Sequence, residues 1–474
     1  GLLSGRGGAG RGDLLRRNGG GADTERAVVD GLDWLARHQS PDGSWGSRTP
    51  SCPQRPACSV PDCDNTVAST AFALLAFAGH GVTHMDGGES AWAPVVDRGL
   101  RFLLKSQRES GLLVTAAWST GSDMYVHAAA TLAIAELSAM TQDPRLRRPL
   151  LKAVDYIVSR QQSCGGWDYQ EGVTGRGDAS IGALVVQAIR AARAAGVVVP
   201  RKCWEEACRF YETVLIPGTG QIAYHVNPGR TWAGVSGAGR SLDAAGHFAR
   251  RCLGLREPAH VQDRVDAHLQ RGFPALTYGN RENGHPVYFT YYATLYFFSE
   301  GGSPWTRWNA RLKEELLPAQ ARAGCARGSW DAAGTDMQSY GRAILTAFCV
   351  LNLEIYYRYL PSSGQDPAAY ARLGDGDGDD TEFLIARLES PAMDIRRAAA
   401  KRLEKRDEAG VFEALADAAA REKTSLRELL VRSLGNFAES PDRRDRLMRF
   451  CGEGEREAVR REAEQVLDRW LRKE

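Results

Sequence analysis

The 474-residue sequence predicts an all-α fold built from repeated helical hairpins. An amphipathic stretch over residues 24–39 ends on Gln39, and a Pro-Asp-Gly-Ser-Trp turn follows at residues 41–45. Similar arrangements follow at Gln107, at Gln161 and at Gln320, with a period of roughly 50–70 residues that indicates a repeat architecture. Between these turns lie apolar stretches without a polar face, which are typical of helices buried on all sides.

Six helix pairs account for the pattern. In each pair the first helix is amphipathic, and the second is more apolar and richer in small residues. The predicted pairs are Thr24–Gln39 with Thr66–Gly79, Pro94–Gln107 with Ser122–Met140, Pro149–Gln162 with Asp178–Ala195, Lys202–Val214 with Gly237–Leu253, Ala259–Gln270 with Pro286–Glu300, and Pro304–Gln320 with Ser339–Leu360. The fourth and fifth pairs have residues 218–221 and 272–274 in place of the tryptophan turn.

The glutamine–tryptophan turns resemble the QW-type repeat of squalene cyclases, terpenoid cyclases and protein prenyltransferase β subunits. The sequence resembles even more closely the bacterial proteins known as prenyltransferase/squalene oxidase repeat proteins. The segments that carry the resemblance are residues 31–35, 42–45, 124–128, 165–167, 177–180, 291–294, 328–330 and 353–361. The resemblance covers most of residues 24–361 and implies that six hairpins close into an (α/α)6 toroid. The resemblance does not imply an activity for this chain.

Changes in composition divide the chain into four parts. Residues 1–23 are rich in glycine and arginine and are expected to form a flexible linker, with a nucleic-acid-binding arm as the alternative. Residues 24–361 form the predicted toroid, and residues 362–380 form a Gly/Asp-rich linker. Residues 381–474 contain short hairpins whose second helices are predicted at 394–405, 425–437 and 455–472. They resemble a HEAT-type array, a fold commonly used to bind protein partners.

Charge and composition narrow the function classes. A formal net charge of +2 gives no electrostatic support for nucleic-acid or membrane-surface binding. No apolar run reaches the roughly 18 residues that a transmembrane helix needs. The chain begins at Gly1 without a signal-like segment, so we interpret it as a fragment of a longer chain, and both an upstream anchor or signal and the localisation stay open.

The standard catalytic and metal motifs of the related families do not fit the predicted toroid. The Asp-Gly-Asp-Asp run at 377–380 matches the acid motif of class II terpene cyclases, but it lies in a polar linker where water keeps carboxylates ionised. No cysteine has an aspartate two residues before it, as zinc prenyltransferases require. Cys52, Cys58 and Cys63 share one proline-rich loop and are compatible with a disulfide, a structural metal site or free thiols. No cofactor is predicted.

Candidate site residues are expected where the inner helices begin, because in a toroid of this type those ends face one mouth of a central cavity. The predicted catalytic residues are Asp178, Asp123, His127 and Asp336, and the predicted substrate-binding residues are Tyr125, Trp167, Tyr288, Tyr291, Tyr292 and Tyr340. Helix capping is the alternative role for the aspartates, and core packing is the alternative for His127 and the aromatic residues.

Three functions remain open from the sequence. The first is a terpene-cyclase-like enzyme, an isomerase or lyase, that binds or transforms an isoprenoid or other lipid in an aromatic cavity. The second is a non-catalytic toroid that, with its HEAT-like segment, forms a scaffold for protein partners. The third is a carbohydrate lyase or hydrolase, for which paired acids beside aromatic residues are suitable. Fold alone does not choose among them.

Overall fold

The computed structural model divides the chain into two compact units, residues 1–374 and 375–474, which are described separately. It describes residues 6, 10–46, 66–115, 123–169, 172, 174–216, 218–227, 231–233, 239–277, 284–359, 381, 384–385, 388, 393–408, 410–452 and 454–472. The boundary between the units falls inside the segment expected to be a Gly/Asp-rich linker.

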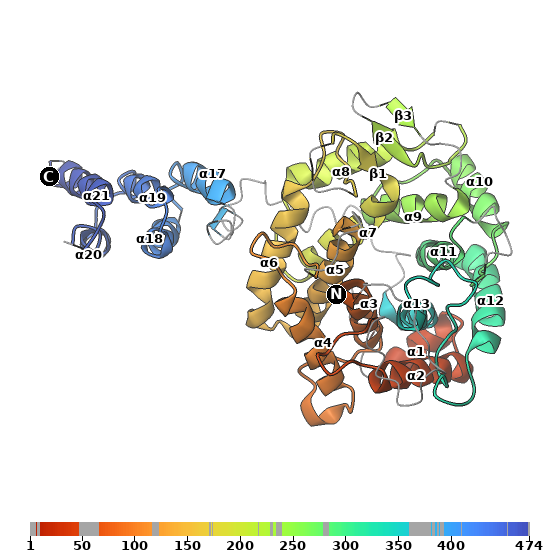
Figure 1. Ribbon diagram of the computed structural model, residues 1–474. Helices are drawn as coiled ribbons and strands as arrows, with labels where there is room; N and C mark the ends of the chain where they lie inside the picture. The colour runs from red at the N-terminus through yellow and green to blue at the C-terminus, as the bar shows by residue number, and fades with distance from the viewer. Residues whose placement is uncertain are drawn as a thin grey trace. The chain divides into compact units, whose positions relative to one another are not determined.

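The first unit is a closed ring of helices (Figure 1). Its inner helices are α3 (Thr66–Gly79), α5 (Asp123–Thr141), α7 (Ala179–Ala194), α9 (Gly239–Cys252), α11 (Pro286–Glu300) and α13 (Arg342–Leu353). Each packs against the next along the chain, and α13 packs against α3, which closes the ring. A short helix, α14 (Ile355–Arg358), follows α13. The predicted toroid of paired helices is therefore confirmed.

An outer layer of helices surrounds this ring. Its members are α2 (Ala22–Arg37), α4 (Ala93–Lys105), α6 (Pro144–Ser159), α8 (Arg201–Thr213), α10 (Ala259–Gln270) and α12 (Gly302–Ala319), and a 3-10 turn, η1 (Gly87–Glu89), precedes α4. The outer helices are amphipathic because only one side faces the inner ring, whereas α3 is buried along nearly its whole length.

Glutamines at the ends of the outer helices hold the ring together. Each donates a hydrogen bond from Nε2 to a backbone carbonyl at or near the start of the next outer helix. The pairs are Gln39 with Val95, Gln107 with Pro149, Gln161 with Cys203, Gln270 with Pro304, and Gln320 with Ala27, at 2.8–2.9 Å. The last pair joins the sixth hairpin to the first. The glutamine of the repeat thus has a structural role that the sequence pattern alone did not reveal.

The tryptophans of the turns fill the space between the two layers. Trp45, Trp167 and Trp330 are at most 1% exposed, and each indole N–H donates a 2.8 Å hydrogen bond to a carbonyl of the preceding outer helix. The turns approach their neighbours closely. At Gly328, where φ is +93°, a Cβ atom would lie 2.1 Å from the carbonyl oxygen of Asp30, so only glycine fits.

A small antiparallel sheet, which the sequence did not predict, lies beside α7. Its strands are β1 (Gly177–Asp178), β2 (His225–Asn227) and β3 (Thr231–Ala233), in the order β1-β2-β3. In its register Asp178 lies opposite His225, and Val226 lies opposite Trp232. The sheet fixes the backbone immediately before α7.

The prediction of a flexible linker over residues 1–23 is wrong for the residues that the structure describes. Helix α1 (Gly10–Arg17) packs against α14. Arg6 is 1% exposed and forms a 2.8 Å ion pair with Glu136, while its Nε donates to the carbonyl of Arg358 at 3.0 Å. Burial of an arginine is possible here because a carboxylate and backbone carbonyls surround it.

The helices that the structure describes in the second unit are α17 (Met393–Leu403), α18 (Val411–Arg421), α19 (Leu426–Leu434), α20 (Pro441–Met448) and α21 (Glu457–Leu471). Helices α17, α19 and α21 correspond to the predicted second helices and pack in sequence. Ion pairs also join neighbouring hairpins, including Arg396 with Glu422 at 2.9 Å. Across the described parts of both units, no helix combines the length and the hydropathy needed to cross a membrane.

Candidate functional site

Asp178 occupies the start of α7, where the backbone leaves the small sheet. Its side chain accepts hydrogen bonds from the backbone N–H groups of Ser180 and Ile181, at 2.9 and 3.4 Å, as an N-cap does. It also accepts a 2.6 Å hydrogen bond from the Ser180 hydroxyl. Asp178 is fully buried, and the capping role considered from the sequence is therefore present.

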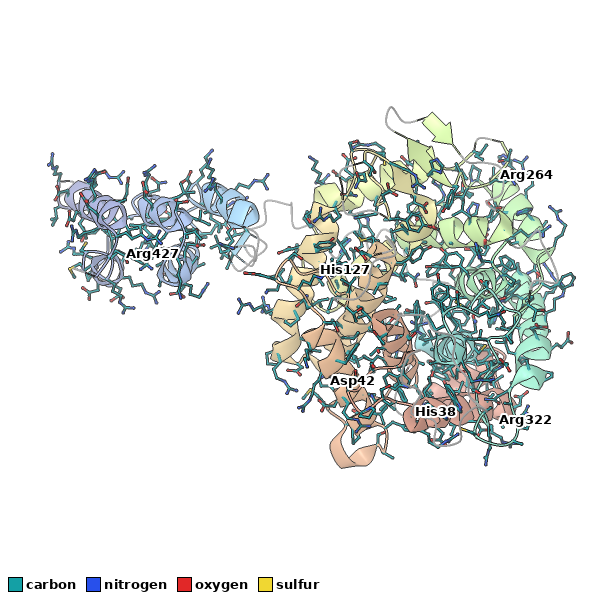
Figure 2. The ribbon with its side chains drawn as sticks, viewed as in Figure 1. His38, Asp42, His127, Arg264, Arg322 and Arg427 are labelled. Atoms are coloured by element: carbon teal, nitrogen blue, oxygen red, sulfur yellow. The ribbon has the colours of Figure 1, made fainter. Side chains whose placement is uncertain are left out.

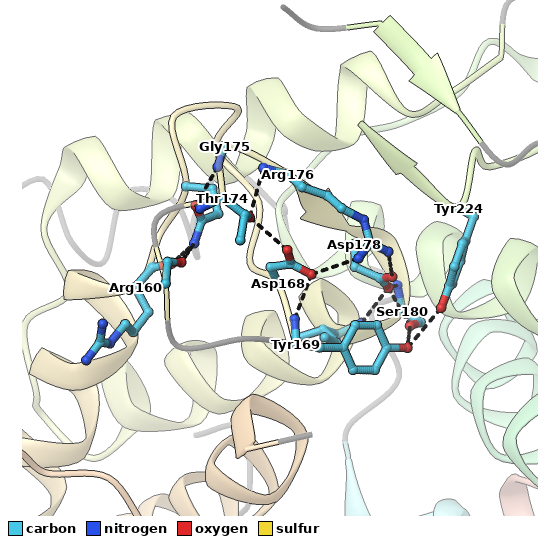
Figure 3. Close-up of polar contacts among 12 residues, drawn as sticks. Arg160, Asp168, Tyr169, Thr174, Gly175, Arg176, Asp178, Ser180 and Tyr224 are labelled. Carbon is cyan, nitrogen blue, oxygen red and sulfur yellow. Dashed lines mark hydrogen bonds and ion pairs between the residues drawn. The ribbon is translucent and has the colours of Figure 1, made fainter. Parts of the chain in front are cut away.

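Four tyrosines, Tyr125, Tyr169, Tyr224 and Tyr288, gather around Ser180 and are here named the tyrosine cluster. The Tyr288 hydroxyl donates to the Ser180 carbonyl at 3.0 Å and accepts from the Tyr125 hydroxyl at 3.4 Å. The Tyr169 hydroxyl lies 3.4 Å from the Ser180 hydroxyl and 3.0 Å from the Tyr224 hydroxyl (Figure 3). All four side chains are only partly buried. The N-terminal ends of α5, α7 and α11 thus meet at a group of phenol hydroxyls.

Arg176 connects two buried carboxylates behind this cluster. Its guanidinium forms ion pairs with Asp168 at 3.1 Å and with Asp178 at 3.2 Å. Asp168 also accepts a 2.7 Å hydrogen bond from the Thr174 hydroxyl, and these contacts hold the segment around residues 174–176 against α7 (Figure 3). Arg176 is 30% exposed, whereas both carboxylates are nearly inaccessible.

The environment keeps the phenols neutral and leaves Asp178 as a hydrogen-bond acceptor. Burial raises the pKa values of Tyr125, Tyr169 and Tyr288, so none is ionised near neutral pH. Burial also raises the pKa of Asp178, but the hydrogen bonds from Ser180 and the charge of Arg176 oppose the rise. Neutral phenols both donate and accept hydrogen bonds, which suits a polar ligand with hydroxyl groups.

Tyr291 and Tyr292 lie deeper in the ring than the tyrosine cluster. Both are 2% exposed, and both hydroxyls bind Gln187 of α7, at 3.4 and 3.1 Å. The ring of Tyr291 also contacts Phe348 edge-on. These two rings therefore contact protein atoms on nearly every side, which is the core packing that the sequence left open as an alternative.

His127, predicted as catalytic, is fully buried in the wall of the ring (Figure 2). Its Nδ1 accepts the backbone N–H of Leu113 at 3.1 Å, and its Nε2 donates to the carbonyl of Ala153 at 3.0 Å. Thr70 and Thr346 accept equivalent turn N–H groups in the first and sixth repeats. Burial lowers the pKa of His127 to about 4. Both ring nitrogens are used within the fold, which is the core role that the sequence left open as the alternative to a catalytic base.

The remaining predicted residues lie apart from the tyrosine cluster or act within the fold. Asp336 accepts the backbone N–H groups of Val287 and Tyr288, at 3.0 and 3.4 Å, and so caps α11. Trp167 is fully enclosed between the layers, which leaves no surface for a substrate. Asp123 begins α5, and Tyr340 is 40% exposed in the turn before α13.

The predicted metal or disulfide loop with Cys52, Cys58 and Cys63 lies outside the described residues, as does the acidic run at 377–380. Within the described part of the chain, no group of three or more His, Cys, Asp or Glu side chains has the arrangement of a metal site.

Sequence reasoning missed Tyr169, Tyr224 and Arg176. Tyr169 and Tyr224 lie in turns rather than on the inner helices, where aromatic residues were sought. One signal was available: Tyr169 follows the turn tryptophan Trp167 by two residues, at the point where the chain leaves the outer layer. Tyr224 follows the corresponding turn of the fourth repeat, which lacks a tryptophan.

Comparisons with known proteins give one family match and several similar solved structures. The family model of HEAT repeats matches residues 381–468. Similar solved structures include an α-1,6-mannanase from Salegentibacter, with 10% identity, a TM-score of 0.48, and coverage of 70% of this chain and 98% of that one. An α-amylase from Clostridium perfringens has the same four values. A type II terpene cyclase from Scytonema has 12% identity, a TM-score of 0.45, and coverage of 70% and 97%.

These structural similarities assign no activity to this chain, because every identity is at most 12% and every TM-score is below 0.5. The closed helical ring and the match to HEAT repeats define the class: an (α/α)6 toroid followed by HEAT-like repeats.

Proposed function

We propose that the toroid binds a polyhydroxylated small molecule of the saccharide class at the tyrosine cluster. The observation that carries the proposal is a connected group of four phenol hydroxyls around Ser180, on side chains that are only partly buried. Tyrosine rings offer apolar faces for the C–H faces of a sugar, and their hydroxyls donate and accept hydrogen bonds with its hydroxyl groups.

Asp178 supports such a site as a positioning residue. It accepts hydrogen bonds from two backbone N–H groups, the Ser180 hydroxyl and Arg176, so both carboxylate oxygens already have protein donors. Burial raises the pKa of Asp178 against these donors and the charge of Arg176. An acid that protonates an alkene must point into an apolar cavity, whereas both oxygens of Asp178 are directed at protein donors. Its role in the proposed site is to fix the orientation of the Ser180 hydroxyl.

Calorimetric titration tests the proposal with trisaccharides of glucose and of mannose as the probes, and with squalene and geranylgeranyl diphosphate as the competing class. We expect saturable binding of a trisaccharide. Tyr288→Phe and Tyr224→Phe should each weaken it by about three- to tenfold, because each removes one hydrogen-bonding hydroxyl. Tyr211→Phe is the matched control: Tyr211 is fully buried and its hydroxyl binds the carbonyl of Ala179. It should change stability without changing affinity.

Two results would overturn the proposal. Binding of an isoprenoid with no response to sugars would favour a lipid-binding toroid. Absence of binding by both classes at millimolar concentration would leave the toroid as a scaffold beside the HEAT-like repeats.

A further inference from the structure

Cys325 and His38 form a thiol–imidazole pair on elements of the ring that do not contribute to the tyrosine cluster. The Cys325 sulfur lies 3.3 Å from Nε2 of His38. Cys325 belongs to the turn after α12, and His38, which Figure 2 labels, follows α2. The pair therefore lies where the sixth repeat meets the first. Both side chains are partly exposed, which allows a small reagent to reach them.

The hydrogen bonds around His38 determine which nitrogen can accept a proton. Nδ1 lies 2.8 Å from the backbone carbonyl oxygen of Trp34. A carbonyl only accepts hydrogen bonds, so Nδ1 carries the proton and Nε2 presents its lone pair to the Cys325 thiol. The imidazole also stacks on the Trp34 indole at a centroid distance of 4.2 Å, which fixes the plane of the ring. The Cys325 thiol is thus the nucleophile, the His38 imidazole is the base, and the Trp34 carbonyl orients the imidazole, which is the arrangement that activates a thiol.

The surroundings keep His38 in the neutral form that can accept a proton. Burial lowers the pKa of His38, and the positive charges of Arg37 and Arg342 lower it further. The imidazole is therefore neutral and able to accept a proton at neutral pH.

We propose that Cys325 is a nucleophilic modification site that reacts with low-molecular-weight disulfides, with His38 as its base. The thiol proton passes to Nε2 of His38, and the Cys325 thiolate attacks one sulfur of the small disulfide. A new S–S bond forms as the old one breaks, and the departing thiolate takes the proton from His38. One thiol and one disulfide are consumed, and one thiol and one mixed disulfide are formed.

The mixed disulfide would form beside the contact that closes the ring. The carbonyl of Cys325 accepts a 3.1 Å hydrogen bond from the Trp34 indole, and Gln320, five residues earlier, donates to Ala27 of α2. Oxidation of Cys325 would therefore add a group next to the contacts that join the sixth repeat to the first.

The test exposes the full chain to oxidised glutathione, quenches the reaction with acid at a series of times, and measures the mixed disulfide at each cysteine by peptide mass spectrometry. Cys451 is the internal reference, because it is also partly exposed but burial and Glu464 raise its pKa. We expect Cys325 to react about tenfold faster than Cys451 or more. Equal rates would overturn the proposal. This comparison needs no variant.

His38→Gln then tests the role of the imidazole. It should slow the reaction of Cys325 about tenfold or more and leave the rate at Cys451 unchanged. An unchanged Cys325 rate in a variant with wild-type circular dichroism would show that His38 is not the base. A parallel rise in both rates would indicate general loosening of the fold and would also overturn the assignment.

Discussion

Trp330→Ala is expected to lower the free energy of unfolding of the toroid by about 3–5 kcal/mol. Trp330 is fully buried, its indole N–H donates to the carbonyl of Leu316 at 2.8 Å, and its ring meets α2 beside Gly31. Truncation leaves a cavity between the sixth and first repeats and removes the partner of a buried carbonyl. Chemical denaturation of the full chain, followed by far-ultraviolet circular dichroism, measures the loss.

Trp204→Ala is the matched control. Trp204 lies on the outer helix α8, is only partly buried, and stacks with the Arg193 guanidinium at 4.7 Å. Its removal creates no enclosed cavity, so we expect a loss of about 1 kcal/mol. Equal losses in the two variants would contradict the view that the glutamine–tryptophan turns hold the ring closed.

The six hairpins could be predicted from the sequence because each layer leaves its own pattern. An outer helix such as α6 buries one face and is amphipathic, whereas α3 is enclosed and carries no polar stripe. The order of packing, from α13 back to α3, came from the family resemblance rather than from the residues. No local pattern encodes a contact between the first and sixth repeats.

The N-terminal segment shows where composition misleads. A stretch rich in glycine and arginine buries little apolar surface, and the usual inference is disorder. Here Leu14 and Leu15 pack against the core, and Arg6 gains a buried carboxylate, Glu136, that lies 130 residues away in the sequence. The free energy that orders this segment comes from a distant partner, which no window of neighbouring residues can reveal.

The candidate site could be predicted only in part, for a similar reason. Asp178 and Tyr288 begin inner helices, and their position at one end of the ring follows from the repeat. Whether an aspartate at a helix start caps the helix or meets a substrate depends on its partners. The ion pair of Asp178 with Arg176 and its hydrogen bond from the Ser180 hydroxyl are seen only in the structure. The role of His127 could not be predicted either, because its two backbone partners, Leu113 and Ala153, lie in the turn after α4 and in α6.

Glu354→Gln is expected to stabilise the toroid at neutral pH by about 1–3 kcal/mol. Glu354 lies between α13 and α14, is fully buried, and neither carboxylate oxygen has a hydrogen-bond partner among the described residues. Burial raises its pKa well above 4.5, against the opposing charges of Arg358 and Arg11. Glutamine keeps the shape and has no charge to desolvate.

The pH dependence identifies the cause. Below pH 4.5 the carboxyl is protonated in both states. Above it, the unfolded chain releases the proton while the folded chain retains it, so wild-type stability falls as pH rises towards the folded pKa, by at most about 1.4 kcal/mol per pH unit. The advantage of Glu354→Gln should therefore be small near about pH 4 and grow towards about pH 7.5. Denaturant titrations at several pH values measure this difference, and a pH-independent difference would contradict it.

Glu136→Gln provides a comparison of opposite sign at a second fully buried glutamate. Burial alone would raise the pKa of Glu136, but Arg6 and Arg358 outweigh burial and lower it. Its carboxylate therefore stays ionised in the folded state, and the stability it contributes is present above pH 4.5 and lost as pH falls through the folded pKa. Glu136→Gln should destabilise the toroid most at neutral pH, because it leaves two buried guanidinium groups without their counter-ion. If the stability difference from wild type changes with pH in opposite directions in the two variants, each difference is caused by ionisation of the glutamate and not by the change of side chain alone.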